Sequence, residues 1–280
     1  MAISAETVKD LREKTGAGML DCKKALEESQ GDVEKAIEFL RKKGLSQAAK
    51  KSARTAAEGI LGHHYNSHGK IGALVEINCE TDFVARNDQF LKFVDQTMQQ
   101  LIQEKPKDLD TFLKAAQPTV TELVAKIGEN IQIRRFVLWE TASPQEKIGF
   151  YLHAGNKIGV MVRFADPDGK LTPEAMKEVA MHVAAMNPLF VRRDEVPAAV
   201  LEKEREIQRA QIDTKKPVEI QNKIIEGKLN RYFADNCLEE QVFVKDPEGK
   251  KTVSAWIKTL APQSRMLQFV RYQVGEGLKN

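Results

Sequence analysis

The sequence predicts an α+β protein with three parts: a small three-helix N-terminal domain, a core of two related subdomains, and a helical arm inserted into the second subdomain. Three observations indicate this. The first 44 residues show helical apolar periodicity, two later segments repeat the same hairpin pattern, and a charge-rich stretch at residues 201–216 lies within an insertion at about 195–235. A chain of 280 residues is long enough for two or three units with their own cores.

The N-terminal domain is expected over residues 1–44. Ser4 can cap a first helix that Gly16-Ala17-Gly18 interrupts, and Asp21 is expected to begin the second helix. Gly31-Asp32 then supplies a stop and a new cap. The apolar stripe of the third helix is Val33, Ala36, Ile37 and Leu40. A unit this small buries little area, so it serves either as a docking module or as a stabilising N-terminal cap.

A basic linker is expected over residues 45–58. Six basic residues lie between positions 41 and 54, and no acidic residue follows them before Glu58. They are Arg41, Lys42, Lys43, Lys50, Lys51 and Arg54. The composition favours a solvated hinge, with an RNA or ribosome contact as the alternative. No aromatic side chain is interleaved for base stacking.

Two segments resemble each other closely enough to indicate a duplication. Residues 65–75 and 151–162 each read as a strand, a glycine-containing turn, and Lys-Ile-Gly at the start of a second strand, which is typical of a β-hairpin. A third strand is expected at 131–140 in the first copy and at 268–277 in the second. The core subdomains are therefore placed at 59–140 and 141–280, each with a small antiparallel sheet and helices.

Helices with one apolar face are expected between these strands. The first subdomain supplies Phe90, Val94, Met98 and Leu101 on one helix, and Val120, Leu123, Val124 and Ile127 on another. The second subdomain supplies Met176, Val179, Ala180 and Val183.

The arm is predicted at about 195–235. Residues 201–216 are rich in charge, and Pro217 restarts a helix that carries Ile220, Ile224 and Ile225. Two helices joined at the TKKP apex would pair antiparallel and project into solvent. The arm is either an insertion without a role or a surface for a partner or a second copy.

The sequence offers no catalytic set, so we predict a binding protein with no cofactor. It contains no phosphate-binding loop, nucleophile elbow or dinucleotide fingerprint. His63, His64 and His68 lack companions at metal-ligand spacing. Cys79 is interpreted as a buried filler, with a reactive thiol as the alternative. His182 is interpreted as structural.

Composition indicates a cytoplasmic location. The three cysteines lie far apart, no apolar leader or membrane span is recognisable, and the net charge is only +3. Neither a membrane nor direct nucleic-acid binding is expected.

The most unusual local feature is the run Cys79-Glu80-Thr81-Asp82-Phe83-Val84-Ala85 after an apolar strand. Thr81 or Asp82 can cap a short helix, which places Phe83 and Val84 in its first turn near solvent. Phe83 there is either a wedge for a partner or a staple that packs back on its own helix.

Six strings, in this order along the whole chain, resemble the bacterial translation elongation factor Ts family. They are TGAGMLDCKKAL (15–26), NCETDFVAR (78–86), IGENIQIRR (127–135), YLHAGNKIGV (151–160), AMHVAAMNP (180–188) and VGEG (274–277). The resemblance implies an N-terminal domain like ubiquitin-associated domains and a coiled-coil arm. Many family members continue past VGEG, whereas this sequence stops three residues later at Asn280.

The resemblance also implies a function. The chain is expected to be a guanine-nucleotide exchange factor for elongation factor Tu, in its GDP-bound and nucleotide-free states. Thr81, Asp82, Phe83 and Val84 would then insert at the GTPase domain and disturb Mg²⁺ and phosphate binding. Further contacts are expected from Met19 and Lys23 in the N-terminal domain and from His153 and Gly155 in the second hairpin turn. Dimerisation of the complex is left open.

Overall fold

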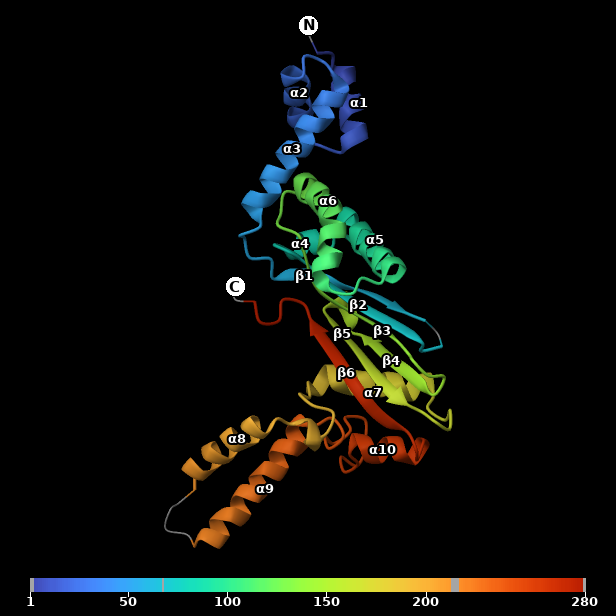
Figure 1. The fold of residues 1–280 in the computed structure, drawn as a ribbon, viewed down its shortest axis with the longest axis vertical. Coiled ribbons are helices and arrows are strands. Elements are labelled where there is room, and N and C mark those ends of the chain that lie inside the picture. Colours follow the sequence, from blue (N-terminus) through green and yellow to red (C-terminus); the bar gives the residue numbers. More distant parts are fainter. Residues whose placement is uncertain (1–2, 67, 213–216, 279–280) are drawn as a thin grey trace.

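The computed structural model describes residues 3–66, 68–212 and 217–278. The molecule is elongated, with a three-helix bundle at one end, a helical arm at the other and the β-sheet core between them (Figure 1). This arrangement confirms the predicted α+β fold. Among the described residues, no helix is both long and apolar enough to cross a membrane.

The bundle consists of α1 (Ala5–Thr15), α2 (Met19–Glu28) and α3 (Val33–Lys51). Ser4 and Asp32 cap α1 and α3 through side-chain oxygens, as predicted. Helix α2 begins at Met19 rather than at Asp21, because Gly18 takes the extended N-cap conformation and its carbonyl accepts the Cys22 N–H. The fully buried residues of the bundle are Leu11, Cys22, Ala25, Leu26 and Ala36.

Helix α3 continues through Lys51, so the first half of the expected 45–58 linker is helical. It runs beside α6 (Leu109–Ile127), and a Cβ added to Gly44 would lie 3.4 Å from the Cβ of Ala125. Part of the basic charge around this linker is neutralised within the chain. The ion pairs are Lys42–Glu38, Lys43–Asp21 and Arg54–Glu80.

The first subdomain holds a three-stranded antiparallel sheet in the order β1-β2-β3. Its strands are β1 (Glu58–Tyr65), β2 (Ile71–Cys79) and β3 (Gln132–Glu140). Helices α5 (Asp88–Glu104) and α6 pack on one face of this sheet. The predicted face of α5 is confirmed, since Phe90, Val94, Met98 and Leu101 are all buried. The predicted stripe of α6 also packs into this core.

The second subdomain repeats the pattern with the order β4-β5-β6. Its strands are β4 (Glu146–Leu152), β5 (Ile158–Ala165) and β6 (Arg265–Gln273), and α7 (Pro173–Met186) and α10 (Val253–Leu260) pack on one face. The predicted face of α7 is buried. The third strand was expected at 268–277, which is wrong at both ends. Residues 274–277 instead form a turn, with Gly275 and Gly277 at positive φ.

The remaining faces of the two sheets pack against each other through Leu74, Ile148 and Met161. Equivalent glycines of the two hairpins allow this approach. A Cβ on Gly72 would lie 2.7 Å from the Met161 sulfur, and one on Gly159 would lie 2.9 Å from a Leu74 methyl carbon. The two sheets therefore meet in a reciprocal interface between the cores of the two subdomains.

The arm is formed by α8 (Ala198–Ala210) and α9 (Val218–Asn236), which follow the short 3₁₀ turn η2 (Arg193–Glu195). Its seam is narrow, with Ile212, Ile225 and Leu229 buried and Ile224 partly buried. Ile220, which the sequence placed on the same apolar set, is exposed. Residues 213–216, which contain most of the expected TKKP apex, lie outside the described residues.

Candidate partner-binding turn

The run singled out in the sequence forms a sharp turn where β2 ends. Strand β2 stops at Cys79, and the four-residue helix α4 (Asp82–Ala85) begins after the two intervening residues Glu80 and Thr81. Thr81 is its N-cap: the backbone is extended, and the side-chain oxygen accepts the Val84 N–H at 3.3 Å. The prediction that this region caps a short helix is confirmed.

Phe83 is the exposed residue of this turn. It is 82% exposed, whereas Ala85 is buried and Val84 packs partly against the core of the first subdomain. Helix α4 is therefore attached through Val84 and Ala85, and Phe83 projects into solvent. The alternative in which Phe83 packs back on its own helix is wrong, because such a staple would cover the ring.

Asp82 forms an ion pair with Arg86 one helical turn later, with 3.1 Å between the nearest nitrogen and oxygen. The Arg86 side chain is exposed and the Asp82 side chain is about half exposed, and pairs near the surface contribute about 0 to 1 kcal/mol. A partner with a cationic or hydrogen-bonding group can therefore replace Arg86 as the partner of Asp82 at little cost in free energy.

Glu129, which follows α6, holds the turn through hydrogen bonds to Glu80 and Thr81. This residue is not among those predicted from the sequence. One carboxylate oxygen accepts the N–H groups of Glu80 at 3.1 Å and of Thr81 at 3.0 Å, and the other accepts the Thr81 hydroxyl at 2.6 Å. Glu80 in return accepts the Asn130 N–H at 2.6 Å. The string IGENIQIRR contains Glu129, but only the folded chain brings it to the turn.

Cys79 lies beneath the turn and is fully buried, which confirms its interpretation as a filler. Its thiol donates to the Thr81 carbonyl oxygen at 3.1 Å. Burial, followed by the nearby Glu129 charge, raises the pKa of Cys79 to about 12. The thiolate that nucleophilic chemistry requires is thus strongly disfavoured here.

The second hairpin turn also lies beside strand β1. It forms the 3₁₀ turn η1 (Ala154–Asn156), which contacts β1 as α4 does. The Lys157 ammonium pairs with Glu58 at 2.6 Å, and Glu58 is the register partner of Cys79. The structure therefore brings this turn and the Thr81–Val84 turn to the same strand.

Within the second hairpin turn, His153 is exposed and its Nδ1 lies 2.8 Å from the Tyr151 hydroxyl oxygen. That contact fixes the direction of the imidazole ring. Gly155 is also exposed and has φ 79°, with nothing near its missing Cβ, so backbone conformation rather than space favours glycine there.

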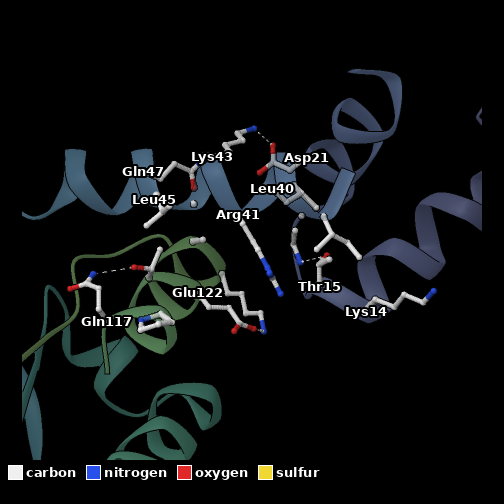
Figure 2. Close-up of a pocket in the computed structure, with 18 residues that line it drawn as sticks. Lys14, Thr15, Asp21, Leu40, Arg41, Lys43, Leu45, Gln47, Gln117 and Glu122 are labelled. Carbon is white, nitrogen blue, oxygen red and sulfur yellow. Dashed lines mark hydrogen bonds and ion pairs between the residues drawn. The ribbon is translucent and has the colours of Figure 1, made fainter. Parts of the chain in front are cut away.

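Met19 and Lys23 lie apart from this region, on α2 in the bundle (Figure 1). Both are exposed, and Leu20 between them is 75% exposed. A cavity of about 700 Å³ separates the bundle from α6, and Arg41 extends from α3 into it (Figure 2). Gly18 and Asp21 line this cavity, whereas Met19 and Lys23 do not.

The histidines do not form a metal site in the described part of the chain, where no three His, Cys, Asp or Glu side chains are grouped to hold an ion. His182 is fully buried and structural: its Nε2 lies 3.0 Å from the Gln241 side-chain oxygen, and its Nδ1 accepts the Val244 N–H. Burial lowers the pKa of His182, which favours the neutral form of the ring.

Comparison with known proteins shows which family the chain belongs to. The family model described as Elongation factor TS matches residues 80–276. The chain belongs to the elongation factor Ts family. Its members are exchange factors of translation elongation. The matched region of this chain begins at Glu80, one residue before Thr81.

Relatives extend the similarity over the N-terminal bundle as well. Elongation factor Ts of Trichlorobacter lovleyi is 45% identical, with 100% of this chain and 94% of the relative covered. The proteins of the same name from Alkalilimnicola ehrlichii and from Clostridium botulinum strain Eklund 17B are 47% and 43% identical, each with 99% of this chain and 94% of the relative covered.

Proposed function

We propose that the chain is a guanine-nucleotide exchange factor that releases GDP from elongation factor Tu by inserting the Thr81–Val84 turn into the GTPase domain. The observation that carries this is the exposure of Phe83, 82%, on a turn whose backbone is held by Thr81 and Glu129. A large apolar side chain on a braced support is the kind of anchor that dominates an interface.

The physical chemistry of the nucleotide site explains why a wedge suffices. Mg²⁺ requires near-ideal octahedral geometry, so a small displacement of its ligands weakens both the ion and the diphosphate that it bridges. Exchange needs no covalent step, which is consistent with a buried, protonated Cys79. Because coupling between two ligands is reciprocal, nucleotide and Mg²⁺ rebinding must in turn release the factor.

Further contacts are proposed at two places. His153 and Gly155 present an exposed turn beside β1, the strand that α4 also contacts. Met19 and Lys23 present an exposed surface on α2, where the neighbouring Leu20 adds apolar area. Contacts from the N-terminal bundle and from the His153 turn would orient the wedge. The GDP-bound and the nucleotide-free partner are both expected to bind.

Stopped-flow release of fluorescent GDP from elongation factor Tu tests the proposal. Phe83→Ala should lower the stimulated release rate by about 30-fold, the equivalent of ~2 kcal/mol for an interface anchor. Leu260→Ala is the matched control, because Leu260 is also exposed but ends α10 in the other subdomain. Release by Phe83→Ala at the wild-type rate would refute the wedge.

The salt dependence of the same release rate separates the wedge from the alternative function, an RNA- or ribosome-binding protein that uses the basic residues of α3 and the linker. Phosphate binding weakens steeply with salt, whereas a wedge interface weakens modestly. We expect the modest dependence, since Lys42, Lys43 and Arg54 already pair with carboxylates of the chain.

A further inference from the structure

We propose that Glu129 is a positioning residue for exchange: it fixes the backbone from which Phe83 projects, without touching the partner itself. This inference rests on the proposed function of the turn. It concerns a residue that is 48 positions away from Thr81 in sequence and joined to this turn by tertiary hydrogen bonds.

Helix α4 needs support from outside, because it is only four residues long. Isolated helices of this length do not persist in water, since nucleation costs more than the few hydrogen bonds return. Its own stabilising contacts are the Thr81 cap at 3.3 Å and the exposed Asp82–Arg86 pair. Val84 and Ala85 bury one side of the helix, but burial alone leaves its direction adjustable.

The Glu129 carboxylate removes that freedom at the start of the helix. Its three hydrogen bonds hold two successive backbone N–H groups and the hydroxyl of the capping residue. Charge-assisted bonds of this kind are shorter and stronger than neutral ones. Since Thr81 also caps α4, its hydroxyl connects Glu129 directly to the first turn of the helix, two residues before Phe83.

Glu129 is itself held in place. Helix α6 ends at Ile127, and its C-cap Gly128 takes a left-handed conformation, with a φ of 89°, directly before Glu129. The next residue after Glu129, Asn130, is buried, and its side-chain amide donates to the Arg54 carbonyl oxygen at 2.7 Å. Its N–H donates to Glu80. The segments Glu80–Thr81 and Glu129–Asn130 therefore hold each other in place through these hydrogen bonds. Glu129 in this way connects the turn to the rigid core.

Two substitutions separate charge from shape. Glu129→Ala removes all three bonds and should lower the maximal GDP release rate from elongation factor Tu by about tenfold or more, as loss of an orienting partner commonly does. Glu129→Gln keeps the volume and one acceptor oxygen, and its amide can donate to the Thr81 hydroxyl. It should therefore retain most of the rate. Glu122→Ala, which breaks an exposed pair with Lys126 on α6, is the control and should act as wild type.

Amide hydrogen exchange on the free chain provides a measurement that does not depend on the partner. In Glu129→Ala the Glu80 and Thr81 amides should exchange at least about tenfold faster, because their acceptor is gone. The amides of α5 should stay protected, which would show that the fold is intact. Unchanged exchange at Glu80 and Thr81 would overturn the proposal.

A double-mutant cycle distinguishes positioning from general destabilisation. If Glu129 acts only through the wedge, Glu129→Ala should cause no further loss in a Phe83→Ala background. Losses that multiply would overturn the proposal, and so would wild-type release by Glu129→Ala when Phe83→Ala is impaired. Wild-type release by Phe83→Ala would instead refute the proposed function of the turn, so the two failures are distinguishable.

Discussion

Replacing Glu76 by glutamine should loosen the joint between the C-terminal turn and the first subdomain. Glu76 lies on β2 and is fully buried. One of its oxygens accepts from Arg134 at 2.9 Å and from the Gly275 N–H at 2.9 Å, and the other accepts from Arg135 at 2.5 Å. The carboxylate thus connects β2, β3 and the turn at 274–277.

The size of the effect follows from these contacts. Glutamine keeps one acceptor oxygen and presents an NH₂ group where a guanidinium donates, so at least one arginine loses its partner. Arg135 retains Glu276 at 3.3 Å, which limits the loss. Removing one member of a buried charged network costs ~3 to 5 kcal/mol. With the arginines about a quarter exposed, we expect about 2 to 4 kcal/mol at pH 7.

The pH dependence gives a second signature. Burial alone raises the pKa of Glu76, but the Gly275 N–H, Arg134 and Arg135 outweigh it, so the pKa lies below its ordinary 4.5. A lowered carboxyl pKa stabilises the fold above the unfolded-state value and loses this contribution as pH falls through the native value. The stability gap between wild type and Glu76→Gln should therefore be full at pH 7 and narrow below about pH 4.5.

Urea unfolding followed by tryptophan fluorescence measures this. Trp139 packs between the two sheets, and a Trp256→Phe background leaves it as the single reporter. Glu248→Gln, which alters an exposed pair with Lys250, should change the midpoint little. A gap that stays constant from pH 7 to pH 3, or a stability loss no larger than that of Glu248→Gln, would contradict the assignment of Glu76 as the charged centre of the joint.

Two further predictions concern the thiol and the glycines. Native Cys79 should react with iodoacetamide at pH 8 far more slowly than in the unfolded chain, because it is buried with a pKa of about 12; rapid native labelling, detected by peptide mass spectrometry, would contradict this. Gly227→Ala should stabilise α9 by about 0.5 to 1 kcal/mol, because the site is open and helical, whereas Gly275→Ala should destabilise, because φ is 75° and the new Cβ would overlap the Ala57 carbonyl. Thermal melts in which Gly275→Ala is more stable than Gly227→Ala would contradict this prediction.

The apolar periodicity of the chain is enough to predict the parts of the fold that depend on local pattern. Helix faces such as Phe90 to Leu101 and the two hairpins follow from spacing and turn chemistry, and the residue type of Thr81 indicates a cap. Spacing alone does not decide which apolar residues of the arm are buried: Ile220 fits the apolar pattern of α9 but lies beyond the buried part of the seam.

The candidate site is predictable only in part, because its supporting contacts are not local. Nothing in the residue types of Glu129 or Glu76 marks them as hydrogen-bond centres, and both resemble ordinary surface carboxylates until the chain is folded. The pairing of Glu58 with Lys157, 99 residues apart, likewise depends on how the two sheets pack. Sequence therefore indicates the exposed residues of the turn and leaves its supports unidentified.

The duplicated core explains why two separate turns meet beside β1. Lys157 of the second hairpin pairs with Glu58 at the start of β1, and the equivalent Lys70 of the first hairpin donates to backbone carbonyls of Pro144 and Glu146 at the start of β4. Each hairpin turn thus lies beside the first strand of the other subdomain, as expected for a reciprocal interface.

The two subdomains differ in the segment that follows the central strand of each sheet, β2 in the first and β5 in the second. After β2 comes the exposed Thr81–Val84 turn, whereas after β5 comes Asp166, which is buried and bonded to Lys147 and Ser264. The Asp166 N–H also donates to the Gln145 carbonyl, which closes that edge. One copy of the repeat therefore ends in a locked structural turn and the other in a projecting one. Because the interface is reciprocal, the second subdomain still supplies the His153 turn beside β1, and the position of that turn depends on the packing of Gly72 against Met161 and of Gly159 against Leu74.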